Sequence, residues 1–309
     1  MTNFYGQYVG FGAGGVIEVF IFGGTSYGYH LGGGEPAVNT VGKYSFTSDG
    51  NSSSVGTLTS ARFEVAGVSS ATHSYAGGGY GATGGVIDKM PFASDGGSSD
   101  VGDMSSDGDR AGCHSSTYGY GIGGKRFSPS PQGIVDKIDK FALASDGNAS
   151  DIGNMSVARY ILAANSSQTH GYGLGGSNAI PAFEPTWQNI IDKFPFASDA
   201  NATDVGNLLF NGTWFSGSSS STHGYLANSG QTTNVIQKHS FASDGDSSDI
   251  ANSSDSRTLS GGNSSSTYGY TVAGWPVNVI DKYAFASDSD ATDVGDASIS
   301  LYAASGTFI

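Results

Sequence analysis

Three of the six histidines are the first residues in this chain whose type and spacing suggest chemistry. His73, His170 and His223 each follow a threonine and stand two residues before a tyrosine. Imidazoles gathered at one place can bind a metal or transfer protons. The other copies of this phrase carry a tyrosine instead, at Tyr27, Tyr118 and Tyr268. Because tyrosine stands in for histidine, the pattern favours a packing role, and we predict no metal among these histidines.

An aspartate-rich sequence motif is the second candidate for chemistry. It reads Ser-Asp-Gly-Asn in one copy, where Asp146, Asn148 and the later Asp151 offer oxygen ligands for calcium. The spacing is not that of an EF-hand loop, and Asp-Gly is a strong signal for a tight hairpin turn. We therefore predict no cofactor, with calcium at these turns as the alternative.

Nucleophiles and phosphate loops are the third class of candidates. The single cysteine, Cys113, cannot form an internal disulfide. The chain contains no G-x-S-x-G, H-E-x-x-H or P-loop motif. We predict no catalytic residue and a protein that is not an enzyme.

Composition excludes two further classes. The net charge is −14, whereas a nucleic-acid partner requires a basic surface. No stretch approaches the 18 or so apolar residues of a membrane-spanning helix, so we expect no membrane insertion. No Lys or Arg precedes Lys43, so the basic region of a signal peptide is missing.

The chain is built from a repeat. The phrase IIDKFPFASDANATDVG at 190–206 has relatives throughout the chain, and a tyrosine followed by small residues precedes each one. Its anchor residue recurs about every 47 residues, a spacing typical of one propeller blade: Phe46, Phe92, Leu143, Phe196, Phe241 and Phe285.

Each unit contains strand signals and no helical period. In 193–197, Phe194 and Phe196 share one face, as a period of two requires. Four short strands per unit predict an all-β fold, a single six-bladed propeller with four-stranded antiparallel blades. We place the blades in 25–309, with units near 25–61, 62–109, 110–158, 159–210, 211–256 and 257–309.

The order of landmarks resembles the kelch repeat. Arg159, the small strand at 163–164, Tyr172 and the glycine pair at 175–176 follow that family's order, although Asp-Val-Gly replaces its outer tryptophan. The sequence of the repeat also resembles kelch-like structural proteins of tailed phages, such as those infecting cyanobacteria. That resemblance implies a tail-fibre, receptor-binding or capsid-decorating protein, located on the virion or an extracellular particle surface.

Most basic residues occupy repeat positions. Six lysines stand in the Lys-Phe strand, and four arginines precede the small-residue strand. We predict that they pair with the repeating aspartates from blade to blade, and that few of them contact a ligand. The lysines are Lys43, Lys89, Lys140, Lys193, Lys238 and Lys282, and the arginines are Arg62, Arg110, Arg159 and Arg257.

One face of the ring is expected to carry the long links. In an antiparallel blade, the links from strand 2 to 3 and from strand 4 to the next blade lie on the same side. All three tryptophans fall in such links, where they either stack on sugar rings or plug their own loops. The candidate ligand-binding residues are Trp187, Trp214, Trp275, Phe183, Lys125 and Arg126.

The first 24 residues form an apolar, glycine-rich segment. Either it or the C-terminal stretch 301–309 can supply the missing inner strand of the first blade. An unpaired apolar strand invites pairing with another chain. We therefore predict assembly with other virion proteins, or with copies of this chain, through Val16, Ile17, Val19, Phe20, Ile21 and Phe22.

Three functions remain open from the sequence. The first is a non-enzymatic virion structural protein that presents the propeller for attachment, with a host-surface glycan as a candidate partner. The second is a free, lectin-like propeller that binds carbohydrate. The third is an enzyme of the copper-oxidase or lyase kind, which the kelch fold also houses; the sequence argues against it, because Cys113 and His114 have no matching Tyr and His cluster.

Overall fold

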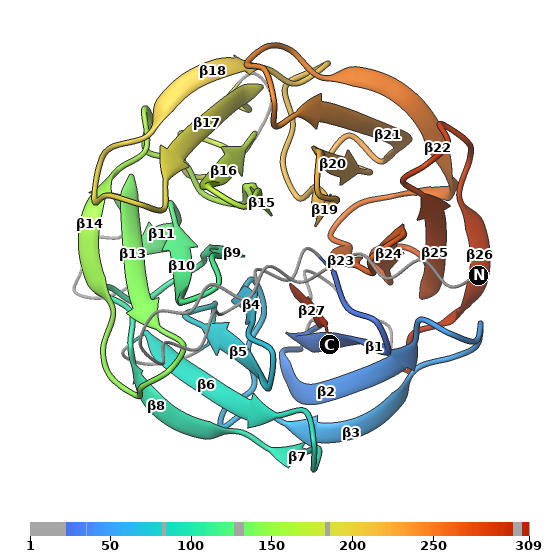
Figure 1. Cartoon of the computed structure of the whole chain (residues 1–309), viewed down its shortest axis with the longest axis horizontal. Helices are drawn as coiled ribbons and strands as arrows, with labels where there is room; N and C mark the ends of the chain where they lie inside the picture. The colour runs from blue at the N-terminus through green and yellow to red at the C-terminus, as the bar shows by residue number, and fades with distance from the viewer. Residues whose placement is uncertain are drawn as a thin grey trace, which may run out of the picture.

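Six four-stranded blades surround a central axis (Figure 1). The computed structural model describes residues 23–34, 36–81, 85–126, 133–182, 186–298 and 305–308. These residues form strands and turns without a helix, so none of them belongs to a helix that could span a membrane. The prediction of an all-β, six-bladed propeller with antiparallel blades is confirmed.

In each blade the four strands follow one another from the axis outward. The inner strands are β27 (Ser305–Phe308), β4 (Ala66–Ser69), β9 (Ala111–His114), β15 (Ala163–Ser166), β19 (Ser216–Ser219) and β23 (Gly261–Ser264). The second strands are β1 (Tyr27–Gly33), β5 (His73–Gly77), β10 (Tyr118–Ile122), β16 (His170–Leu174), β20 (His223–Ala227) and β24 (Tyr268–Val272).

The outer half of each blade holds the Lys-Phe strand and the Asp-Val-Gly strand. The third strands are β2 (Val38–Ser45), β6 (Val86–Pro91), β13 (Lys137–Ala142), β17 (Ile190–Pro195), β21 (Thr233–Ser240) and β25 (Val279–Ala284). The outer strands are β3 (Ser53–Thr57), β8 (Ser99–Asp103), β14 (Ser150–Asn154), β18 (Thr203–Asn207), β22 (Ser248–Arg257) and β26 (Thr292–Asp296). Short strands β7 (Gly96–Gly97), β11 (Lys125–Arg126) and β12 (Gly133–Ile134) lie in turns and links.

The C-terminal strand closes the ring. β27 pairs antiparallel with β1, and Gly28 stands opposite Phe308. The first blade therefore combines the last strand of the chain with three strands from its beginning. Gly24 instead forms a parallel bridge with Ser265, in the turn between β23 and β24. Of the two sequence alternatives, the one with 301–309 as the closing segment is correct for 305–308, and Val16–Phe22 lie outside the described residues.

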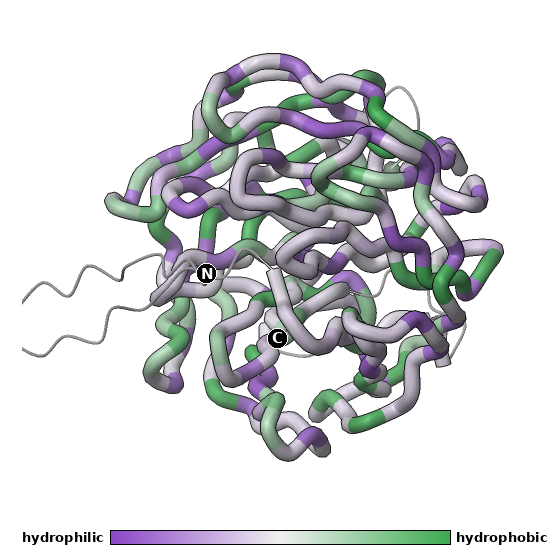
Figure 2. The backbone as a smooth tube through the Cα atoms, turned by 45° about the vertical axis from the view of Figure 1, so that its right-hand side comes forward, coloured by the Kyte–Doolittle hydropathy of each residue, from purple (hydrophilic) through white to green (hydrophobic). Residues whose placement is uncertain are grey.

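Aromatic stacking between blades explains the two landmarks of the repeat. The buried tyrosine of one blade stacks on the anchor phenylalanine of the next, as Tyr172 does on Phe241 with ring centroids 4.9 Å apart. Four further junctions repeat this contact: Tyr29–Phe92, Tyr120–Phe196, Tyr225–Phe285 and Tyr270–Phe46. At the remaining junction Tyr75 donates a hydrogen bond to the carbonyl of Leu143 at 2.9 Å. Figure 2 shows short polar and apolar stretches alternating along the backbone, as expected when each strand packs its own apolar residues into a junction.

Close backbone contact explains the Asp-Val-Gly strand. A Cβ atom on Gly206 would lie 2.3 Å from the carbonyl oxygen of Gly245, in the hairpin of the next blade. The following residue, Asn207, donates its backbone N–H to Asp246 at 2.8 Å. The hairpin of each blade thus lies directly on the outer strand of its neighbour. In five blades this contact leaves no room for a side chain, at Gly56, Gly102, Gly153, Gly206 and Gly295. The fifth blade has Ala251 at the equivalent position.

A ring of ion pairs links all six blades. Each repeat lysine reaches the hairpin aspartate of the next blade, and the sixth pair joins the last blade to the first. The prediction of blade-to-blade pairing is therefore confirmed for the lysines. Because five of the six aspartates are at least 50% exposed and Asp95 is 29% exposed, one pair contributes less than about 1 kcal/mol. The pairs are Lys43–Asp95, Lys89–Asp146, Lys140–Asp199, Lys193–Asp244, Lys238–Asp288 and Lys282–Asp49.

The arginines behave differently from the lysines. Arg159 pairs with Asp192 at 2.6 Å, and both residues belong to the fourth blade. The prediction of blade-to-blade pairing is therefore wrong for Arg62, Arg110 and Arg159, because each pairs with an aspartate on the third strand of the blade that it leads into. Arg257 ends β22 of the fifth blade and pairs with Asp281 on β25 of the sixth, so this pair does join two blades. All four pairs have side chains that are at most 1% exposed, so they belong to the core: Arg62–Asp88, Arg110–Asp139, Arg159–Asp192 and Arg257–Asp281.

The third strand also matches the inner strand of the preceding blade by polarity. At five junctions a polar residue of the inner strand faces a ring that carries a polar atom, and an apolar residue faces phenylalanine. The polar pairs are Asn263–Tyr44, Asn165–His239 and Ser218–Tyr283. The apolar pairs are Val68–Phe141 and Cys113–Phe194. At the sixth junction the hydroxyl of Thr307 instead forms a hydrogen bond with that of Ser74 at 2.8 Å. The matching gives the polar atom of each facing ring a partner within its junction.

The buried histidine of the fifth blade predicts acid sensitivity. Burial lowers the pKa of the His239 imidazole to about 3, so the folded protein keeps it neutral while the unfolded chain protonates near 6.5. The free energy of unfolding must then fall as the pH drops below about 6.5. We expect His239→Tyr, which copies the Tyr44–Asn263 pair, to remove about 2 kcal/mol of the loss between pH 7 and 5.

Urea unfolding of both proteins at the two pH values measures this difference. His30, whose pKa burial lowers to about 4, is present in both proteins, so its effect cancels in the comparison. Equal losses of stability in wild type and variant would contradict the assignment.

Candidate functional site

The three tryptophans lie in links between strands, as the sequence suggests. Trp187 stands between β16 and β17, Trp275 between β24 and β25, and Trp214 between β18 and β19. The first two are links from strand 2 to 3, and the third leads from strand 4 to the next blade. All three therefore belong to one face of the ring.

Their surroundings differ. Trp275 is 48% exposed, and its backbone pairs with Thr258. Trp187 is half-buried and bridges to Ser177, and its indole N–H has no hydrogen-bond partner within the described part of the chain. Neither ring lines the axial cavity. Phe183 lies outside the described residues.

Lys125 and Arg126 form the short strand β11, which pairs with β12. Both side chains are half-buried. The ammonium of Lys125 lies 5.8 Å from the ring centroid of Tyr160, and its charge lowers the pKa of both Glu64 and Asp109 against the raising effect of burial. Lys125 is therefore close to Glu64 and Asp109, although neither Lys125 nor Arg126 is among the residues that line the axial cavity.

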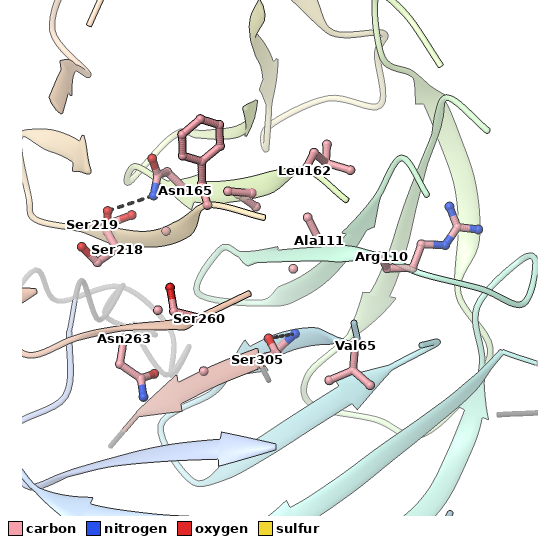
Figure 3. A pocket seen from close by; sticks show the side chains of 18 of the residues that line it. Val65, Arg110, Ala111, Leu162, Asn165, Ser218, Ser219, Ser260, Asn263 and Ser305 are labelled. Atoms are coloured by element: carbon pink, nitrogen blue, oxygen red, sulfur yellow. Dashed lines mark hydrogen bonds between the residues drawn. The ribbon is translucent and has the colours of Figure 1, made fainter. Parts of the chain in front are cut away.

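A cavity of about 150 Å³ lies on the axis (Figure 3). Its walls are the six inner strands and the links that lead into them. Small residues form these walls because the inner strands nearly touch: a Cβ atom on Gly262 would lie 2.1 Å from the carbonyl oxygen of Gly217. Hydroxyl groups of Ser218, Ser260 and Ser305 add polarity.

Four links present a strained residue at the mouth of this cavity. Glu64, Ile161, Trp214 and Leu259 occupy the same repeat position and have φ angles of +56°, +51°, +52° and +62°. Left-handed backbone is uncommon for residues other than glycine and is costly for a β-branched one. All four line the cavity, so the strain places four side chains at its entrance.

Two of these four residues meet across the axis. The indole Nε1 of Trp214 donates a hydrogen bond to Oε1 of Glu64 at 2.9 Å. Their links lead into the fifth and second blades, which stand opposite each other in the ring (Figure 1). The Trp214–Glu64 bond therefore spans the mouth of the cavity.

Asp109 completes the group at the mouth. Its side chain is 4% exposed, and its Oδ1 has no hydrogen-bond partner among the described residues. Burial and the neighbouring Glu64 raise the pKa of Asp109 well above its usual value, and burial also raises the pKa of Glu64. The neighbouring carboxyl groups thus favour the protonated form of Asp109, because two carboxylates side by side in a desolvated place repel each other.

Sequence reasoning missed Glu64 and Asp109. Neither belongs to a repeated motif, and each seemed an ordinary polar residue of a link. The available signal was local: the equivalent residues Ile161 and Leu259 are apolar, so an acid at this position departs from the repeat.

The three repeat histidines do not line the cavity. Each accepts or donates a hydrogen bond with the preceding threonine, as His170 Nδ1 does with Thr169 Oγ1 at 2.8 Å. In the part of the chain that the structure describes, no three His, Cys, Asp or Glu side chains are grouped to hold a metal. Cys113 is buried, which raises the pKa of its thiol.

The oxygens of the aspartate-rich turns have protein partners. Asp146 pairs with Lys89, and Asn148 Oδ1 accepts the backbone N–H of Asp103 at 3.0 Å. These residues join neighbouring blades, which is the role that a tight turn pressed onto the next outer strand requires.

Comparison with known protein families and with curated proteins finds no match to this chain. Its function is therefore inferred from its own chemistry. The mouth of the cavity offers an aromatic ring, two neighbouring carboxyl groups and an unused buried acceptor. These groups suit hydrogen bonding to a small polar molecule.

Proposed function

We propose that this chain is a non-enzymatic attachment protein, a structural component of a virus particle that presents a kelch-like propeller to a carbohydrate on a host surface. The observation that carries the proposal is the structural difference between the two faces of the ring. One face bears all three tryptophans, and the chain enters the ring at the other.

The entry point follows from the contacts of Gly24. Its bridge partner Ser265 lies in the turn between the inner and second strands of the sixth blade. Such turns lie opposite the links that hold the tryptophans. We propose that the segment before residue 23 joins other virion proteins or copies of this chain, which leaves the tryptophan face free.

Rigidity supports an attachment role. The ring is closed by β27, by stacked aromatics at its junctions and by six ion pairs between blades. A scaffold of this kind holds recognition loops in fixed positions, which lowers the entropic cost of binding.

Electron microscopy of the full chain beside a variant lacking residues 1–24 tests the assembly role. We expect defined oligomers or decorated particles from the full chain and single rings from the shorter one. Identical single rings from both would refute assembly through this segment and would favour a free, lectin-like propeller.

A glycan array tests the binding face. We expect the propeller to bind a subset of glycans, and Trp275→Ala to weaken binding tenfold or more, as loss of an aromatic anchor does. Leu209→Ala is the matched control, because Leu209 is an apolar residue in a link on the same face and is 44% exposed. If no glycan binds, or if both variants bind like the wild type, the carbohydrate role is wrong.

A further inference from the structure

We propose that the mouth of the axial cavity is a binding site for one terminal sugar residue, held by Asp109, Glu64 and Trp214. This inference rests on the proposed function and deepens it, because it assigns the ligand's end group to a particular place on the face. Neither Glu64 nor Asp109 belongs to a repeated motif or to the residues that the sequence pointed to.

Unused acceptors define what the ligand must supply. Two buried oxygens in the cavity wall have no hydrogen-bond donor among the described residues: Oδ1 of Asp109 and Oδ1 of Asn263. Their side chains are 4% and 2% exposed. A buried acceptor without a donor is unfavourable, so a molecule that brings hydroxyl groups would satisfy both atoms.

One donor in the cavity wall also lacks a hydrogen-bond partner among the described residues, but it does not face the space that the ligand would occupy. Arg110 Nε also lacks a partner, but Figure 3 shows the guanidinium directed away from the middle of the cavity. It pairs there with Asp139. The remaining polar residues that line the cavity include serines, whose hydroxyls both donate and accept, as well as His114 and Asn165.

Charge favours a neutral ligand over a cation. Lys125 and Arg110 both act on Asp109, and Lys125 also acts on Glu64. The positive charge of Lys125 therefore already offsets negative charge on these two carboxyl groups. An ammonium or metal ion would meet the lysine, whereas a hydroxyl group meets only the acceptors.

Size and shape agree with a single sugar ring. A cavity of about 150 Å³ corresponds to roughly five water molecules at about 30 Å³ each. The apolar face of a sugar ring would lie against Trp214, whose indole is fixed across the mouth by its bond to Glu64. Aromatic rings provide the flat apolar surface that such a face requires.

Trp214 can serve as the only reporter of this site. The chain contains three tryptophans, so Trp187→Phe combined with Trp275→Phe leaves Trp214 alone. We would titrate this variant with free glucose, galactose, mannose and N-acetylglucosamine at millimolar concentrations and follow the indole emission. We expect a saturable change with at least one of these sugars.

Asp109→Ala in the same background tests the acceptor. We expect roughly tenfold weaker binding, because alanine offers no oxygen to a hydroxyl group of the sugar. Asp204→Ala, at an exposed position on the outer strand β18, is the matched control and should bind unchanged. Circular dichroism and urea unfolding would establish that both variants fold. Glu64→Gln, which keeps the shape of the side chain, provides a second variant and should weaken binding in the same direction.

Two outcomes would overturn the inference. One is the absence of any sugar-dependent change in Trp214 emission, and the other is equal binding by wild type, Asp109→Ala and Glu64→Gln. If Trp214 stays silent while the array still shows glycans that depend on Trp275, the axial site is wrong and the proposed function stands. If neither assay shows binding, the carbohydrate role fails together with this site.

Discussion

Asp192→Ala is expected to lower the free energy of unfolding by about 3 to 5 kcal/mol. The substitution leaves the Arg159 guanidinium buried without its carboxylate, and both side chains are 0% exposed in the folded protein. It also removes the acceptor for the backbone N–H of Ser156, which lies 3.1 Å from Asp192 Oδ2. Urea unfolding at neutral pH measures the effect.

Asp244→Ala is the matched control for this prediction. Asp244 pairs with Lys193 at 2.7 Å, but its side chain is 55% exposed. Water solvates the lysine that is left behind, so the expected loss is less than about 1 kcal/mol. Equal losses for the two aspartates would show that burial does not set the strength of these pairs.

The fifth blade suggests how the buried pair can be replaced. At the positions of Arg159 and Asp192 it carries Gly212 and Gln237, and the ring of Phe215 lies against Gly212. Arg159→Gly with Leu162→Phe and Asp192→Gln would transplant this arrangement into the fourth blade. We expect the triple variant to be more stable than Asp192→Ala, because no charge is left unpaired.

Gly306→Val is expected to destabilise the ring by about 3 kcal/mol or more through overpacking. A Cβ atom at this position would lie 1.9 Å from the carbonyl oxygen of Gly262, on the inner strand of the last blade. That atom belongs to the backbone and cannot turn aside, so β27 must move away from its place beside β1. Hydrogen exchange should then be faster at the amides of β1, and the urea midpoint should fall.

Gly97→Ala is the control for this substitution. A Cβ atom on Gly97 would meet only Thr57 Oγ1, at 3.8 Å, which is ordinary van der Waals contact. Its stability should stay within about 0.5 kcal/mol of the wild type, as is usual for surface changes. If Gly306→Val unfolds like the wild type, the close approach of the inner strands does not limit ring closure.

The sequence by itself determined the architecture, because the packing contacts between neighbouring blades are repeated around the ring. A tyrosine that must stack on the next blade's phenylalanine, and a glycine that must admit the next blade's hairpin, recur at fixed spacing. Each copy reinforces the same interpretation, so the number of blades and the strands within them could be predicted. The lysine–aspartate ring could be predicted for the same reason.

Tertiary structure alone decided three matters that involve single residues. The choice between two similar segments for the closing strand depends on which one pairs with β1. Arg62, Arg110 and Arg159 each pair with a buried aspartate on the third strand of the blade that they lead into, whereas Arg257 pairs across two blades. Glu64, Asp109 and Trp214 lie 45 to 150 residues apart and become neighbours only because the ring brings links from different blades to one axis. Nothing in their local sequence repeats, so periodicity carries no information about their meeting.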